Sequence, residues 1–114
     1  MDLGLAERTD AGWTVLTVSG EIDIATAPSL RERLHALLAD DKRQIVVDLD
    51  DVGFLDSTAL GVLVGVLKRA RAEDGEVRIV CTQPRVRKVF EITRLDSAFD
   101  LFDSVDEAVR GAQE

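Results

Sequence analysis

Apolar and polar residues alternate along this chain with two periods, one typical of strands and one typical of helices. Segments with a two-residue alternation, or a short continuous apolar run, are predicted strands. Residues 45–49 form the continuous run, as expected of a central strand that is covered on both faces. The predicted strands are residues 3–5, 13–19, 45–49, 76–81 and 99–102.

Apolar residues at helical spacing separate most of these strands. Leu30, Leu34, Leu37 and Leu38 share one face of a first helix, which Thr26 is expected to cap and which has Pro28 in its first turn. Three further helices are predicted at about 58–73, at 84–93, and from a Ser104/Glu107 capping box onward.

The order of these elements predicts an α/β protein. Two adjacent strands are followed by an alternation of helices and strands, which implies right-handed crossovers between parallel strands. We expect a mostly parallel sheet of four to five strands, with an N-terminal antiparallel strand and about four helices. No internal repeat or linker interrupts the pattern, so residues 1–114 are interpreted as a single domain.

Charge limits the partners of this protein. The chain carries 22 carboxylates and 14 Lys or Arg residues, for a formal net charge of −8. Such a surface repels nucleic-acid phosphates and anionic membranes, and it favours a partner with a basic face. The N-terminus lacks the basic and apolar regions of a signal peptide, so a cytoplasmic location is expected.

Metal binding has weak support in the sequence. The chain has one His and one Cys, so no pair of them has zinc-ligand spacing. The cluster of Asp48, Asp50 and Asp51 contains oxygen ligands for a hard cation, but the pattern of a calcium-binding loop is absent. A solvated acidic loop is the favoured interpretation, and no cofactor is predicted.

Serine hydrolysis also has weak support. Ser57 is not in a Gly-x-Ser-x-Gly turn, and His35 lies inside the first predicted helix, where a surface or boundary position is expected. Cys81 is interpreted as a buried structural thiol, in preference to a redox group. We therefore expect a protein that is not an enzyme.

Asp56, Ser57 and Thr58 stand where an acidic segment meets a helix. Ser57 or Asp56 is suited to cap that helix, which contributes about 1 kcal/mol. Thr58 is a second hydroxyl in the same turn, suited to bond a local backbone group. A hydroxyl at a helix start is also accessible for a regulatory phosphate, so both interpretations of Ser57 remain open on position alone.

With these residues identified, the chain resembles the anti-sigma factor antagonists of the bacterial STAS-domain family. The resemblance covers essentially the whole chain. Two departures occur: Ala59 and Arg94 stand where family members usually have Gly. The matching blocks are Gly20-Glu21-Ile22-Asp23, Ala27-Pro28, Asp48-Leu49, Phe54-Leu55-Asp56-Ser57-Thr58-Ala59-Leu60-Gly61-Val62-Leu63 and Arg85-Val86-Arg87-Lys88-Val89-Phe90-Glu91-Ile92-Thr93.

The resemblance implies a phosphorylation switch at Ser57. In such proteins the unmodified form binds an anti-sigma factor that is also a GHKL-type serine kinase, which frees the sigma factor. The kinase then phosphorylates the antagonist, and a PPM-type phosphatase resets it. ATP and magnesium belong to those partners, and a monomer is the simplest state for such exchange. The alternative is a STAS module of a sensory or transport complex without phosphorylation.

The resemblance also directs attention to the residues around Ser57. Asp23 is expected near Ser57, where it meets either the partner or solvent. The second helix is apolar almost all round, so one side is expected to pack on the sheet. The remaining side, around Val62 and Val66, is either a docking ridge or buried against a neighbouring helix. The predicted partner-binding set is Asp23, Asp56, Ser57, Thr58, Val62 and Val66.

Overall fold

The five strands form one sheet in the order β1-β2-β3-β4-β5. The computed structural model describes residues 3–110. The strands are β1 (Gly4–Asp10), β2 (Trp13–Ile22), β3 (Gln44–Leu55), β4 (Glu76–Val80) and β5 (Leu101–Phe102). The helices are α1 (Ala27–Ala39), α2 (Ser57–Ala72), α3 (Pro84–Ile92) and α4 (Val105–Arg110).

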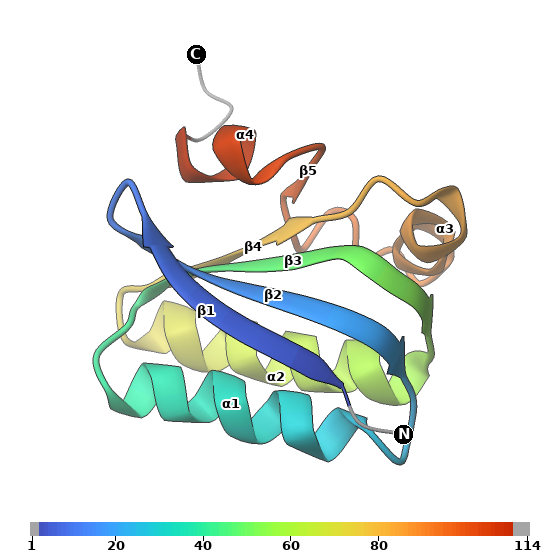
Figure 1. Cartoon of the computed structure of the whole chain (residues 1–114), viewed down its shortest axis with the longest axis horizontal. Coiled ribbons are helices and arrows are strands. Elements are labelled where there is room, and N and C mark those ends of the chain that lie inside the picture. Colours follow the sequence, from blue (N-terminus) through green and yellow to red (C-terminus); the bar gives the residue numbers. More distant parts are fainter. Residues whose placement is uncertain (1–2, 111–114) are drawn as a thin grey trace.

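Only the first strand pair is antiparallel. β1 pairs with β2 across a tight turn, and each following strand pairs in parallel with the next, with one helix between them. α1 and α2 lie side by side under the sheet, while α4 lies above it (Figure 1). The predicted α/β fold is therefore confirmed, including the number of helices and the orientation of the first strand. No helix within residues 3–110 is long and apolar enough to cross a membrane.

The β1–β2 turn has two residues with left-handed backbone conformation. Ala11 and Gly12 have φ angles of 52° and 85°, and the strand register closes directly on the pair formed by Asp10 and Trp13. Two positive φ angles are the requirement of a type I′ turn, whose twist matches that of the flanking strands. This turn fixes the register of the antiparallel β1–β2 pair.

β3 extends further than the sequence suggested. The acidic stretch 50–53 was expected to be a loop, but it is part of the strand. The register with β2 shifts twice, between Thr17 and Ser19 and again between Gly20 and Glu21, so β3 contains extra residues opposite β2. Such bulges let a strand keep its pairing while its side chains change face, which hides the alternation that predicts strands.

The apolar side chains of the sheet divide between two faces. Ile45 and Val47 face α1 and α2 in the larger core, whereas Val46 belongs to a smaller cluster beneath α4. All three are fully buried, which confirms that β3 is covered on both faces. Most of the apolar burial that stabilises the fold lies in the larger core.

Arg78 joins α4 to the sheet. Its guanidinium carbon lies 4.3 Å from the centroid of the Trp13 ring and 5.6 Å from that of Phe102. Its Nη1 atom donates to the Ala108 carbonyl of α4 at 2.6 Å. A cation stacked on an aromatic face and bonded to a helix carbonyl is favourable, so Arg78 holds this short helix in place.

Arg94 occupies a strained position that can be tested. It has a φ of 63°, in the left-handed region that favours Gly. A side chain costs about 1–2 kcal/mol in the left-handed region, so Arg94→Gly should raise the free energy of unfolding by about 1 kcal/mol. Urea unfolding followed by the fluorescence of the buried Trp13 measures this change.

The matched control is Glu91→Gly. Glu91 is exposed inside α3, where glycine lowers stability by about 1 kcal/mol. If Arg94→Gly destabilises the protein as Glu91→Gly does, the strain at Arg94 is not real.

Candidate functional site

The candidate site forms where β2 and β3 end side by side. Ile22 and Leu55, the last residues of the two strands, are register partners. The N–H of Asp56 donates to the carbonyl of Ile22 at 3.2 Å, which extends the pairing by one step. Since Asp23 follows Ile22 and Asp56 follows Leu55, two carboxylates 33 positions apart in sequence leave the sheet at the same edge.

Asp56 caps α2. Its Oδ1 atom accepts the N–H of Ala59 at 3.1 Å, and its backbone is extended, as is usual for a cap. Its carbonyl accepts the N–H of Leu60, which opens the helical ladder. Of the two residues that suited the cap in sequence, Asp56 is the one that occupies it.

Because Asp56 caps α2, Ser57 does not. It is the first residue of α2, it is exposed, and its hydroxyl makes no hydrogen bond within residues 3–110. Thr58 is also exposed, and it likewise has no side-chain bond in that part of the chain. Both residues lie in the first turn of α2, at the positive end of its dipole, which is a favourable place for an added phosphate.

Asp23 organises the turn between β2 and α1. Its Oδ1 atom accepts the N–H groups of Ala25 at 2.9 Å and Thr26 at 3.1 Å. These backbone hydrogen bonds, with Thr26 the larger contributor, hold the pKa of Asp23 below its usual range. Asp23 therefore stays charged at neutral pH, and its side chain is fixed in the turn that follows Ile22, the residue whose carbonyl bonds Asp56.

Thr26 does not act as the expected helix cap. It stands at the cap position of α1, but its hydroxyl makes no capping bond. The hydroxyl donates to the carbonyl of Glu21 at 2.7 Å and accepts the N–H of Asp23 at 3.0 Å. The tight turn after β2 brings these groups within reach, so Thr26 closes the turn that positions Asp23.

Negative charge gathers around this turn. Glu21, Asp23 and Asp51 line one hollow at the surface, together with the backbone of glycines in β2 and β3. Asp56, the cap of α2, adds a carboxylate directly before Ser57. A further anion at Ser57 would therefore lie next to this carboxylate as well as at the positive end of the helix dipole.

Two exposed apolar side chains accompany these carboxylates, and sequence reasoning missed them. Ile24 directly follows Asp23 and is 75% exposed, while Phe54 lies three residues before Ser57 and is 44% exposed. Few large apolar side chains are exposed on this protein, so their placement at one edge indicates a contact surface. The signal in the sequence was an Ile in a turn and a Phe in a bulged strand segment.

The exposed side of α2 differs from the one expected. Val66 is fully buried in the larger core, so a docking ridge that includes Val66 is wrong. Val62 is half-buried and lines an open groove between α1 and α2. Val66 follows Val62 by four residues, a net rotation of about 40° around the helix, which takes it out of the groove and into the larger core. The other groove residues are Arg31, His35, Thr58, Gly61 and Gly65.

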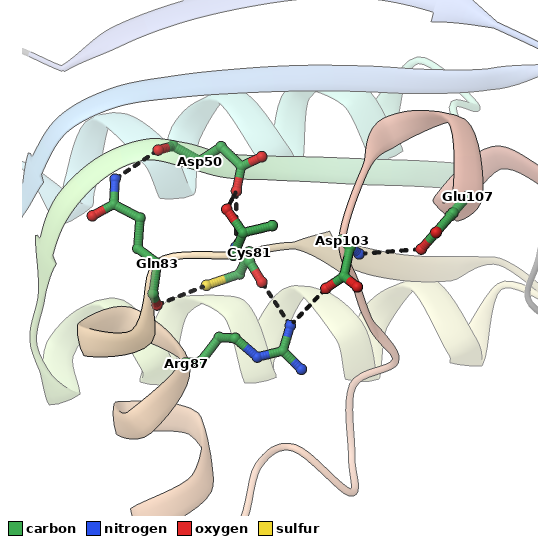
Figure 2. Close-up of polar contacts among 7 residues, drawn as sticks. Asp50, Cys81, Gln83, Arg87, Asp103 and Glu107 are labelled. Atoms are coloured by element: carbon green, nitrogen blue, oxygen red, sulfur yellow. Dashed lines mark hydrogen bonds and ion pairs between the residues drawn. The ribbon is translucent and has the colours of Figure 1, made fainter.

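Asp50 belongs to a polar network that joins β3 to α3 (Figure 2). Its Oδ1 atom accepts the N–H and the hydroxyl of Thr82, and its carbonyl accepts Gln83 Nε2 at 2.7 Å. Asp50 is thus a structural anchor, which corrects its interpretation as part of a solvated loop. Burial raises the pKa of the neighbouring Asp48.

The other candidates from the sequence were a metal site, His35 and Cys81, and both side chains are at least half-buried in the fold. Within residues 3–110 no group of three His, Cys, Asp or Glu side chains is placed to hold a metal. His35 is half-buried, as expected of a boundary residue, and its Nδ1 lies 2.8 Å from Arg69 Nη1. Cys81 is fully buried, and burial raises the pKa of its thiol to about 11, which leaves it unreactive at neutral pH.

The cap at Asp56 can be tested by substitution. Asp56→Ala should lower the free energy of unfolding by about 1 kcal/mol, because the N–H of Ala59 loses its acceptor. Asp56→Ser keeps a capping oxygen and should recover most of that loss. Urea unfolding measures both, and equal stability of Asp56→Ala and wild type would contradict the cap.

The pKa of Asp23 can be tested by titration. A lowered pKa in the folded state means that the unfolded state takes up the proton first as pH falls. The stabilisation by Asp23 is therefore complete above the ordinary value of 3.8 and is lost as pH falls through the lower, folded value. Carboxyl carbon NMR should give a midpoint below 3.8, and Asp23→Asn should flatten the acid decline of Tm.

Comparison with known proteins gives the same family over nearly the whole chain. The model of the STAS domain matches residues 5–108. An anti-sigma-B factor antagonist of Staphylococcus aureus (strain NCTC 8325 / PS 47) is 38% identical over 95 residues, covering 83% of this chain and 88% of that protein. An anti-sigma-B factor antagonist of Bacillus subtilis (strain 168) is 36% identical over 86 residues, covering 75% and 78%.

A solved structure agrees with these sequence relatives. The crystal structure of an anti-sigma factor antagonist from Mycobacterium paratuberculosis superimposes with a TM-score of 0.88. It is 31% identical and covers 95% of this chain and 92% of its own. Sequence match, fold and strand order agree, and we conclude that this chain belongs to the STAS domain family.

Proposed function

We propose that this protein is an anti-sigma factor antagonist that works by partner switching. In its unmodified form it binds an anti-sigma factor that is also a GHKL-type serine kinase, and the sigma factor is released. Phosphorylation of Ser57 by that kinase ends the binding, and a PPM-type phosphatase restores the unmodified form. The named functions of its relatives from S. aureus and B. subtilis support this proposal.

The observation that carries the proposal is that Asp56 caps α2 while the neighbouring Ser57 is left exposed. Asp56 alone caps α2, so the Ser57 hydroxyl is exposed and free for phosphate transfer. Adding a phosphate there breaks no hydrogen bond of the folded chain within residues 3–110. A reversible modification of a stable domain requires this arrangement.

The physical effect of the phosphate differs between the free protein and the complex. A phosphate adds about −1.5 to −2 charges at neutral pH, and the dipole of α2 favours such a charge by about 0.3–1 kcal/mol. The free protein therefore tolerates it. Against a partner, the phosphate loses water and meets Asp23 and Asp56, so the complex is destabilised. About 1.4 kcal/mol of such repulsion lowers the affinity tenfold.

The surface that meets the anti-sigma factor surrounds Ser57. Asp23, Asp56 and Thr58 supply its polar groups, and Val62 supplies an apolar contact in the groove beside α2. Ile24 and Phe54 join this set because they are exposed at the same edge of the sheet. Apolar anchors within a rim of carboxylates suit a partner surface with apolar pockets and basic residues.

The phosphate switch is tested by mass spectrometry. The protein is incubated with ATP, magnesium and each GHKL-type anti-sigma kinase of its host. A single added phosphate on Ser57 is expected, and Ser57→Ala should take up none while binding the kinase permanently. Thr58→Val is the matched control, since it removes the neighbouring hydroxyl and should still accept one phosphate.

Affinity and stability separate this proposal from its alternative. Phosphorylated and unmodified protein should have Tm values within about 2 °C, while kinase affinity falls at least about tenfold. Ser57→Asp should show part of that loss, because it adds one negative charge. Kinase binding without any phosphate transfer, or no binding at all, would favour a STAS module that works without phosphorylation.

A further inference from the structure

Positive charge exceeds negative charge on two helices of this acidic protein, α2 and α3, but in α2 Arg69 and Arg71 pair with Glu73 and Glu76. Residues 84–95 hold four Lys or Arg side chains and one carboxylate, whereas the whole chain has a formal net charge of −8. This segment comprises α3 and the turn that follows it. The local charge therefore has the opposite sign to that of the rest of the molecule.

Three exposed side chains of α3 share one line along the helix. Arg85, Lys88 and Ile92 are spaced by three and four residues, which places them on the same face. All three are exposed, and Ile92 is 71% exposed, as large an apolar exposure as any but Ile24 within residues 3–110. We call these three residues the α3 ridge; it is about 10 Å long.

The side chains of the α3 ridge take part in none of the interactions that stabilise the fold within residues 3–110, whether ion pairs, side-chain hydrogen bonds or apolar clusters. Seven ion pairs involve residues of the described chain, and neither Arg85 nor Lys88 takes part in any of them. Neither makes a side-chain hydrogen bond in that part of the chain. Ile92 likewise lies outside both apolar clusters. Within residues 3–110 the ridge therefore has no ion pair, no side-chain hydrogen bond and no place in an apolar cluster.

The opposite face of α3 is firmly attached. Val86 and Phe90 are buried, and the Phe90 ring packs edge-on against Phe99 with centroids 5.9 Å apart. Arg87 Nη1 donates to the Cys81 carbonyl at 2.8 Å and to Asp103 at 3.3 Å (Figure 2). A helix anchored in this way presents its outer side chains without further ordering, which favours binding.

We propose that the α3 ridge is a second docking surface, for a protein segment that presents an apolar side chain flanked by carboxylates. Arg85 and Lys88 would pair with the carboxylates, and Ile92 would be buried against the apolar side chain. The ridge uses residues of α3 only, so it is distinct from the surface around Ser57 and does not depend on phosphorylation.

An acidic protein segment fits the charges better than a nucleic acid or a membrane. The carboxylates outside residues 84–95 repel an extended array of phosphates, while a short acidic segment meets only the ridge. Two cations on 10 Å of helix also match a short peptide contact, since nucleic-acid affinity grows with the number of phosphates neutralised.

The test uses isotope-labelled full-length protein and NMR. The probe is a synthetic amphipathic peptide with a Leu flanked by Glu residues, and its twin has Lys in place of each Glu. Shifts confined to α3 amides are expected with the acidic peptide alone, and its Kd should rise steeply with salt. The double variant Arg85→Glu/Lys88→Glu should weaken binding at least about tenfold, and Ile92→Ser by about threefold or more.

Lys68→Glu is the matched control. Lys68 is an exposed cation of α2 without an ion pair within residues 3–110, and its reversal should leave the Kd unchanged. Unchanged Trp13 fluorescence and Tm would show that each variant is folded. The proposal is overturned if the acidic peptide shifts no α3 amide, or if Lys68→Glu weakens binding as much as the ridge variants. Binding of phosphatidylglycerol vesicles or a single-stranded oligonucleotide through the ridge, without peptide binding, would also overturn it.

Discussion

The hydrogen bond from the Asp56 N–H to the Ile22 carbonyl is the contact on which the site depends. It continues the β2–β3 pairing beyond the last residues of both strands. Because the two strands are parallel, their carboxyl ends leave the sheet at one edge, and each is followed at once by an aspartate. One aspartate caps α2, while the other closes the turn into α1. Ser57 follows the capping aspartate and is exposed.

The two aspartates have similar structural roles, because each carboxylate accepts backbone N–H groups of a turn. The Asp56 carboxylate accepts an N–H of the first turn of α2, and the Asp23 carboxylate accepts two N–H groups of its own turn. These bonds stabilise the turns in the free protein. The bond of Asp56 also fixes its carboxylate directly before Ser57, where in the proposed switch a phosphate would be repelled once a partner removes the surrounding water. In that proposal, stability and regulation depend on the same capping side chain.

The surfaces of this protein differ in sign. The edge around Ser57 combines carboxylates with Ile24 and Phe54, whereas α3 combines cations with Ile92. The polar network around Asp50 attaches α3 to β3, five residues before that strand ends. A small domain can thus present two unlike surfaces on one rigid sheet, provided that the helices on its rim are anchored by their inner faces.

The sequence by itself determined the order of the elements, the antiparallel first strand and the apolar run of β3, because these follow from local periodicity and turn residues. It also marked Asp56, Ser57 and Thr58, which are consecutive, whereas Asp23 was identified through the resemblance to the STAS family. Only the tertiary structure decided that Asp56 is the cap, that Val66 is buried and that residues 50–55 continue a bulged strand. Those outcomes depend on strand register and on which side of α2 meets the sheet. Both are set by contacts between residues far apart in the chain, which no local pattern contains.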